Sequence, residues 1–309
     1  IPFVPITRRM RYKATLLVIV FVCHAAAAAA QTTEEAAPKP AVSVRGFASL
    51  SMGVNVAVPS TTTNTLRVFD STNRRPSLDV IELAFAHEAT KVGAFGFTLN
   101  ALSGERIPNV SAASGLFRDS ITGLPVGGFD VKQAFVTWKA TDTLKIDAGK
   151  FTTHVGAEVI EGADGANDTY SRGLLFGYAE PFTHTGVRAV YTVNDHWSAT
   201  MLVVQGWDNV RDNNVRKSFG AQVAFTPAPN VSVTANYIGG PERADSTDWR
   251  HLYNVVAVGH WQDRVTFTLS GDLGREAGAA NGATARWQGV SAGAKLAVDP
   301  RNAVAARIE

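Results

Sequence analysis

The chain of 309 residues contains a single cysteine, Cys23, which lies in an apolar stretch near the N-terminus. If that stretch is removed during export, no disulfide and no thiolate chemistry remains. A lipid anchor on Cys23 is the less favoured alternative, because such an anchor needs a small residue before the cysteine and Val22 is not small.

Long hydrophobic runs and an excess of charge of one sign are also missing. No second apolar stretch reaches the roughly 18 residues that a membrane-spanning helix needs. The 29 Lys and Arg against 27 Asp and Glu leave a formal net charge of +2, too small to indicate nucleic acid as a partner. The 45% hydrophobic and 18% charged content excludes a disordered chain and a helical membrane protein.

The N-terminus predicts export. Residues 10–30 begin with basic positions, continue through the apolar run 16–22 and end in alanines. This is the organisation of a cleavable signal peptide, with cleavage expected after Ala30. Residues 1–9 are expected to be a spurious extension upstream of Met10, and residues 31–41 a mobile leader.

From residue 42 onward, apolar and polar side chains alternate with a period of two, which is typical of β-strands. The first example places Val42, Val44 and Leu50 on one side and Arg45 on the other. Each predicted strand has about the length that a tilted strand needs to cross a bilayer, and no segment has a helical period. The predicted strands are 42–56, 78–87, 94–102, 131–139, 144–151, 185–193, 197–206, 218–226, 231–238, 251–260, 265–273, 288–298 and 303–309.

Long and short connections alternate between these strands. Tight turns are expected near residue 90 and at 140–143, 194–196, 227–230, 261–264 and 299–302, and every other connection is long, including the glycine-rich stretch 274–286. This alternation favours an all-β, up-and-down antiparallel transmembrane β-barrel with short periplasmic turns and long external loops. Bacterial single-chain barrels have an even number of strands. We therefore expect about 16 strands in the complete barrel (residues 42–309 here) and a C-terminal truncation.

The two faces of the strands then separate lipid from a polar lumen. A soluble barrel would place the apolar set inside, and the period alone does not distinguish the two. Tryptophan placement favours lipid outside, because aromatic residues gather at both membrane interfaces. The expected girdle residues are Trp138, Trp197 and Trp261 beside tight turns, and Trp207, Trp249 and Trp287 toward the long loops.

Several short motifs resemble a known family. They are QAFVTW (133–138), AGKF (148–151), SRGLLF (171–176), PFTHTGVR (181–188), QGWDN (205–209) and GGPE (239–242). From about residue 131 to the end, the chain is similar to the beta-barrel porin-2 (OmpL-like) family of bacterial outer-membrane proteins. The resemblance implies a β-barrel with porin-like transport.

The longest connection, 152–184, is rich in acidic residues. Its carboxylates are Glu158, Glu161, Asp164, Asp168 and Glu180. The inward phase of the strands offers four basic residues, Arg45, Lys145, Arg188 and Lys295. If this connection folds into the lumen, acids facing a basic wall would set a transverse field that tunes ion selectivity. A solvated external loop is the equally weighted alternative.

No catalytic, metal or cofactor site is expected. His154 and His184 have no tight ligand spacing, so solvated imidazoles are favoured over a metal site. Ser171 has no G-x-S-x-G context, although Asp208 could meet His184 in three dimensions.

We therefore expect an outer-membrane porin for passive diffusion of small hydrophilic solutes or ions. The alternatives are a non-conducting barrel for adhesion or envelope structure and, less favoured, an outer-membrane hydrolase. Expected partners are outer-membrane lipid, the solutes and the assembly machinery, and a homo-oligomer is left open.

Overall fold

Thirteen antiparallel strands form one sheet, in the order in which they occur along the chain, in a computed structural model that describes residues 42–55, 63–107, 115–117, 128–244 and 246–309. The predicted fold class and all thirteen predicted strands are confirmed. The predicted extension, signal peptide and leader, residues 1–41, lie outside the described residues. The strands are β1 Ser43–Met52, β2 Pro76–His87, β3 Phe95–Ser103, β4 Phe129–Lys139, β5 Leu144–Thr152, β6 Thr183–Thr192, β7 Trp197–Val204, β8 Ser218–Ala228, β9 Val231–Pro241, β10 Trp249–Trp261, β11 Val265–Ala280, β12 Ala283–Asp299 and β13 Asn302–Ile308.

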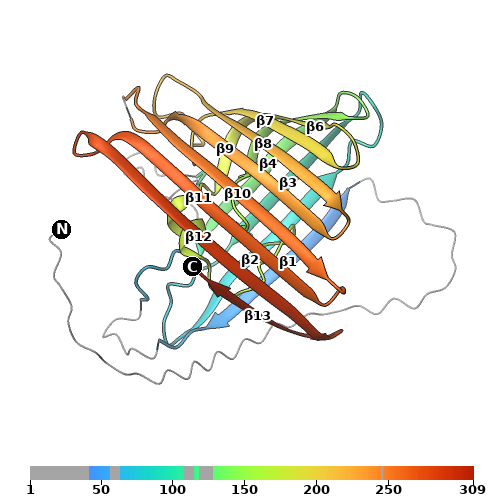
Figure 1. Cartoon of the computed structure of the whole chain (residues 1–309), viewed down its shortest axis with the longest axis vertical. Helices are drawn as coiled ribbons and strands as arrows, with labels where there is room; N and C mark the ends of the chain where they lie inside the picture. The colour runs from blue at the N-terminus through green and yellow to red at the C-terminus, as the bar shows by residue number, and fades with distance from the viewer. Residues whose placement is uncertain (1–41, 56–62, 108–114, 118–127, 245) are drawn as a thin grey trace, which may run out of the picture.

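The sheet curls into a barrel wall (Figure 1). The N-terminal strands, blue to green, lie behind the yellow-to-red strands of the C-terminal half. Among the described residues, β1 pairs with β2 alone and β13 with β12 alone, so the sheet is not closed. No helix in the described part of the chain has the length and apolarity that a membrane crossing requires.

Most connections alternate in length as predicted. Residues 88–94 and 242–248, expected as a short and a long connection, are equally long, and one further stretch departs from the prediction. Residues 274–286, expected as a flexible external loop, are mostly strand: β11 and β12 continue to a turn at Asn281 and Gly282. These residues have φ angles of 51° and 89°. Asn-Gly suits a tight hairpin turn because both residues tolerate positive φ. The glycine content of this stretch therefore serves a hairpin and not a loop.

The two faces of the sheet differ in polarity along every strand. On β8 and β11, Val223 and Leu269 are 45% and 52% exposed on the outer face. On the inner face Asn236 and Asp272 are 5% and 2% exposed. An apolar exterior around a polar interior is the arrangement of an outer-membrane barrel and the reverse of a soluble one.

Aromatic rings gather on the outer face at both ends of the strands. Beside the tight turns, Trp138 stacks with Phe95 and Trp197 with Phe225, while Trp261 is 63% exposed. At the opposite end the outward aromatic group is built by β9 and β10. Its members, joined by ring contacts, are Trp249, His251, Tyr237 and Tyr253.

Trp207 and Trp287, also expected in the girdle, lie inside. Both pack against a buried apolar cluster, and their rings meet edge to face at 6.2 Å. Trp287 shares the inward phase of β12, and its Nε1 donates to the carbonyl of Ala179 at 3.2 Å. The expectation for these two residues rested on their nearness to long loops, which does not determine the side of the sheet on which a ring lies.

A charge on the outer face should cost far more than the same charge on the inner face. We expect Val223→Arg to lower the free energy of unfolding in a bilayer by about 2–4 kcal/mol, because its side chain meets lipid near the middle of β8. Ala224→Arg, the adjacent inward position, is the matched control and should cost much less. Denaturant unfolding of both variants measures the difference, and equal losses would contradict the assignment of the faces.

Candidate functional site

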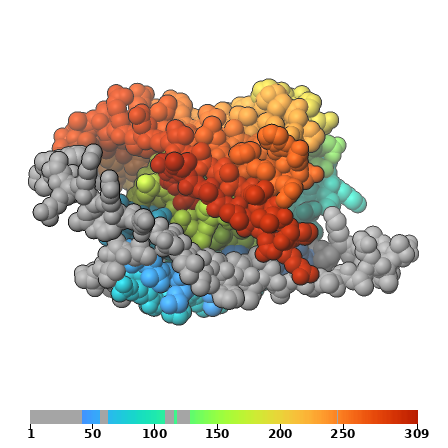
Figure 2. Space-filling model, turned by 60° about the horizontal axis from the view of Figure 1, so that its bottom comes forward, coloured from blue at the N-terminus to red at the C-terminus, as the bar shows by residue number. Residues whose placement is uncertain are grey.

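The long connection between β5 and β6, residues 153–182, lies inside the barrel, and we call it the lumen segment. It contains a five-residue π-helix, Leu175–Ala179. Figure 2 shows yellow-green atoms from this part of the chain between the red C-terminal strands and the blue N-terminal ones. Val155, Ile160 and Phe176 of the lumen segment are buried. The segment therefore packs as part of the interior.

One attachment of the lumen segment is a buried lysine on β4. The Nζ atom of Lys132 lies 2.8 Å from Glu82 of β2 and 2.5 Å from Asp164 of the segment. Gln133 Nε2 donates to the second oxygen of Asp164 at 2.7 Å, and Asn100 Nδ2 donates to Glu82 at 2.7 Å. The side chains of Lys132 and Glu82 are both 0% exposed. A buried ammonium between two carboxylates is stable only while both partners remain.

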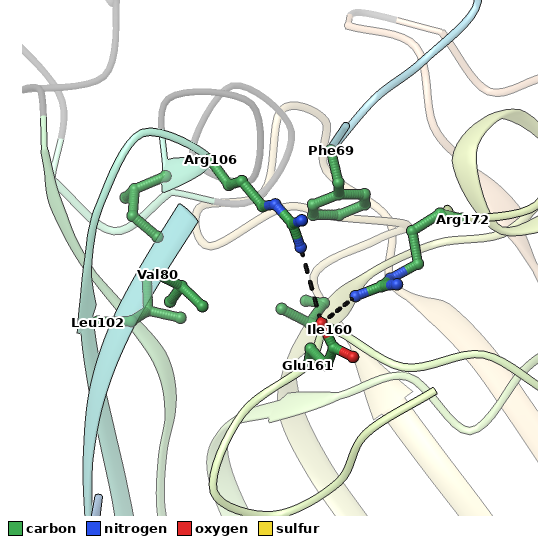
Figure 3. Close-up of a pocket in the computed structure, with 8 residues that line it drawn as sticks. Phe69, Val80, Leu102, Arg106, Ile160, Glu161 and Arg172 are labelled. Atoms are coloured by element: carbon green, nitrogen blue, oxygen red, sulfur yellow. Dashed lines mark hydrogen bonds and ion pairs between the residues drawn. The ribbon is translucent and has the colours of Figure 1, made fainter. Parts of the chain in front are cut away.

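A second attachment joins two arginines through one carboxylate (Figure 3). Arg172 lies 2.6 Å and Arg106 3.7 Å from Glu161 of the segment, and Arg106 also lies 3.0 Å from Asp79 of β2. Figure 3 shows both guanidinium groups directed at Glu161 beside Phe69. The cavity between them measures about 10 Å³, space for about one water molecule. This ion-pair cluster around Glu161 encloses no space large enough for a solute.

The C-terminal strands β12 and β13 also hold the segment. Arg307 Nη1 lies 2.8 Å from Glu158 and donates to Thr169 Oγ1 at 2.5 Å and to the carbonyl of Ser171 at 2.6 Å. Lys295 Nζ lies 2.7 Å from Asp168. The segment is therefore attached to β4 through Lys132 and, near the other edge of the open sheet, to β12 and β13.

The wall between these attachments carries a row of inward amides. Gln222 donates to Asn236 at 2.8 Å, Asn236 to Asn254 at 2.7 Å, and Asn254 to Asp272 at 2.7 Å, along the paired strands β8 to β11. The segment joins this row where the backbone N–H of Gly156 donates to Asn254 at 3.2 Å. The row gives the segment polar partners at mid-height of the wall.

Glu180 of the segment faces Asp272, at the end of this row. Burial, and after it the charge of Asp272, holds the pKa of Glu180 well above its ordinary value. Two carboxyl groups that face each other in a buried place are costly to ionise together. Gly156, with a φ of 87°, lies against Glu180, and a Cβ there would overlap the carboxyl. Glycine is required at this point.

Beneath the start of the segment the interior is apolar. The buried cluster consists of Phe151, Val155, Leu202, Val204, Ile238 and Leu252. Leu202, Ile238 and Leu252 occupy inward positions of β7, β9 and β10. Part of the barrel is thus filled by packed side chains, and the polar inner surface is confined to the remainder.

The end of the segment is fixed by two polar residues, Asp208 and His184, near the long-loop end. Asp208 accepts the backbone N–H groups of Phe182 at 2.7 Å and Thr183 at 3.0 Å. His184 bonds to Thr153 Oγ1 at 3.0 Å and to the carbonyl of Gly206 at 3.1 Å. Burial raises the pKa of Asp208 to about 7, against the effect of the two amide hydrogen bonds.

The four basic residues predicted for the wall do not form one surface. Lys295 faces the segment, but Arg188 pairs with Asp147 of β5 at 2.7 Å and lies over the ring of Phe151. Arg45 and Lys145 are exposed, at the end of the strands next to the tight turns, and neither has an ion-pair partner among the described residues.

The five predicted acids do come together in the interior, and nearly all are neutralised. Glu158, Glu161, Asp164 and Asp168 each pair with a cation, and burial together with Asp272 raises the pKa of Glu180. Burial also raises the pKa of Glu158, although Gly173 N–H and Arg307 oppose the shift. The segment therefore presents much less negative charge than its sequence indicates.

The sequence interpretation named Lys295, the partner of Asp168, but missed the other partners of these acids. Arg307 was detectable, since it lies on the inward phase of β13 opposite Gly293. Lys132 was not, because a β-bulge at Asn100 and Ala101 leaves it without a paired position and breaks the alternation. Arg106 lies just past the end of β3, where no period applies.

The arrangement does not support a hydrolytic or metal centre. Asp208 binds backbone amides, and His184, fully buried, binds Thr153 and Gly206, so these two side chains do not bond to each other. Ser171 Oγ faces Arg307 at 3.3 Å. Within the described residues, no group of three His, Cys, Asp or Glu side chains is placed to hold a metal ion.

An apolar exterior, sequential antiparallel strands and a polar segment across the interior define a bacterial outer-membrane β-barrel of the porin type. The description "Putative beta-barrel porin-2, OmpL-like" applies to the family that matches residues 41–309. The chain belongs to this family, and the resemblance in its motifs is confirmed. None of the curated proteins matches the chain.

Several solved structures are similar to the chain at low sequence identity. A loop L8 deletion mutant of OmpT, an outer membrane protein of Vibrio cholerae, is 12% identical with a TM-score of 0.52, over 86% of this chain and 80% of that one. OpdQ of Pseudomonas aeruginosa is 11% identical with a TM-score of 0.40, over 82% and 60%. The outer membrane channel DcaP of Acinetobacter baumannii is 10% identical with a TM-score of 0.39, over 87% and 91%. Identities this low concern the fold alone.

Loss of the buried lysine should destabilise the barrel strongly. Lys132→Met leaves Glu82 charged and enclosed, so we expect a loss of about 3–5 kcal/mol in the free energy of unfolding. The double variant Lys132→Met with Glu82→Gln removes the unpaired charge and should recover most of the loss. Lys139→Met is the control, because its partner Asp142 is 84% exposed and the pair contributes at most about 1 kcal/mol. Equal stabilities of the single and double variants would contradict the argument.

The raised pKa of Asp208 predicts a pH dependence. Between its ordinary value of 3.8 and about 7, the folded state keeps a proton that the unfolded chain releases, so stability falls as pH rises through this interval. Asp208→Asn retains an acceptor for the two amides and removes the titration. We expect this variant to lose less thermal stability than the parent between pH 5 and 8.

Thermal unfolding in detergent, followed by circular dichroism, measures this difference. Glu242 and Arg250 also face Asp208. Burial raises the pKa of Glu242 as well, so a smaller decline remains in the variant. Asp195→Asn, in the exposed turn between β6 and β7, is the control and should follow the parent. If Asp208→Asn also follows the parent, Asp208 is ionised in the fold.

Proposed function

We propose that this outer-membrane barrel is a porin that passes small hydrophilic solutes or ions by passive diffusion. The observation that supports this most is the lumen segment, which lies in the interior and is held by ion pairs to β4 and β13. A segment fixed across a polar lumen narrows it without requiring a conformational cycle. Family membership supports the same function.

The narrowed lumen would select ions through the few charged side chains that remain exposed. Lys295 and Asp168 form a pair in which each side chain is 43% exposed. Arg45 and Lys145 add exposed positive charge at the tight-turn end. We propose that these residues, and not the buried acids, determine ion preference. We also propose that the protein is not an enzyme. Its partners would be outer-membrane lipid and the outer-membrane assembly machinery.

Single-channel recording in a planar bilayer tests the proposal directly. The full-length chain, refolded and checked for heat-modifiable migration in a gel, should give stable ohmic steps in KCl. Its reversal potential under a salt gradient gives the ion preference. A folded barrel without conductance would favour the adhesion or envelope role.

Neutralising an exposed acid should change selectivity more than neutralising a buried one. We expect Asp168→Asn to shift the reversal potential toward anion preference, because it leaves the half-exposed Lys295 without its partner. Glu161→Gln should leave the reversal potential nearly unchanged and lower stability, because Glu161 is enclosed between Arg172 and Arg106. The reverse order of effects would contradict the proposed division of roles.

A further inference from the structure

A cavity of about 170 Å³ lies between the lumen segment and the inner face of β11–β13. It is distinct from the small cavity beside the ion-pair cluster around Glu161, which has space for about one water molecule. The lining from the segment consists of Ala157, Glu158, Val159, Ala166, Asn167, Asp168 and Thr169. The lining from the strands consists of Thr268, Ser270, Ser291, Gly293, Ala294, Ala306 and Arg307.

The strand side of the cavity is a patch of hydroxyl groups. Thr268 pairs with Gly293 and Ser270 with Ser291 across β11 and β12, so all four positions share the inner face. The side-chain hydroxyls of Thr268 and Ser291 form no hydrogen bond with any residue that the structure describes. Ser270 accepts from Asn254 at 3.1 Å, which leaves its own O–H to donate. Three donor–acceptor groups therefore face the space above Gly293.

The charges at this cavity are already matched. Arg307 uses its guanidinium on Glu158, Thr169, Ser171 and Glu309, and Glu158 also accepts the N–H of Gly173. Asp168 is paired with Lys295, but both remain 43% exposed and can still bond to a further partner. An anion or cation entering here would find no uncompensated opposite charge. A neutral solute with several hydroxyls would find donors and acceptors together.

The geometry points to a binding site for neutral polyhydroxylated solutes of monosaccharide size, and we propose this assignment. It rests on the proposed porin function and names the class of solute. The volume equals that of roughly six water molecules. The lining has no aromatic ring against which a sugar could stack. The contacts are hydrogen bonds exchanged with water, which are individually weak, and weak binding suits a solute that must leave again.

Current through single channels of the full-length protein provides the test. D-glucose added at millimolar concentrations should reduce or interrupt the KCl current in a saturable manner. Gluconate and glucosamine, at the same concentrations and ionic strength, should do so less. Absence of any current would refute the porin function itself. Normal current without a glucose effect, or stronger block by either charged analogue, would refute the binding assignment alone.

Variants at the hydroxyl patch locate the site. Thr268→Val and Ser291→Ala each remove one hydroxyl with little change of shape and should weaken glucose block about 3–10-fold. Thr234→Val on β9, an inward threonine outside the cavity lining, is the matched control and should leave block unchanged. Folding of each variant is checked by heat-modifiable migration. If both cavity variants fold, conduct and respond to glucose as the parent does, the cavity is not the site.

Discussion

The structure depends on one constraint, that a backbone crossing lipid must satisfy its N–H and C=O groups within the protein. From β2 to β12 the chain meets it by pairing each strand with both of its sequence neighbours, in a continuous ladder. Pairing in sequence order places successive connections at opposite ends of the strands. In an outer-membrane barrel one end has short turns and the other has long loops, so short and long connections alternate along the chain. It also places successive side chains on opposite faces, so Val223 and Leu269 meet lipid while Gln222 and Ser270 face inward.

The lumen segment poses the opposite problem, because it lies inside the barrel but outside the ladder. Its backbone must find partners among side chains, and the wall supplies them: Asn254 for Gly156 N–H, Asp208 for Phe182 N–H and Arg307 for the carbonyl of Ser171. The inward polar residues are thus the anchors of an inserted segment as well as a lining for water. Their charges appear in opposite-sign pairs since an enclosed charge without a partner is costly.

The sequence predicted the strands well because the period of two comes from the ladder itself. The sequence prediction failed where a β-bulge or a tight turn interrupts the alternation of side chains. The bulge at Asn100 concealed Lys132, and the positive φ of Asn281 and Gly282 turned an expected loop into a hairpin. The acids of the lumen segment were identified, but their neutralisation was not, because their partners Lys132, Arg106 and Arg307 are distant in sequence. The sequence analysis assigned Trp287 to the outer girdle because it is near a long loop. Its position in the alternation of β12 instead places its side chain on the inner face.

The family motifs have a physical meaning in this arrangement. PFTHTGVR supplies the Phe182 and Thr183 amides that Asp208 of QGWDN accepts, and Glu242 of GGPE accepts the N–H of Trp207 at 2.6 Å. AGKF contributes Phe151, whose ring lies 6.5 Å from that of His184. Four motifs far apart in sequence thus meet where the lumen segment ends. They fix the position of the segment, whereas none of the residues lining the cavity beside β11–β13 belongs to these motifs. The fold can therefore keep the lumen segment in place while the hydroxyls and exposed charges that line this cavity vary independently.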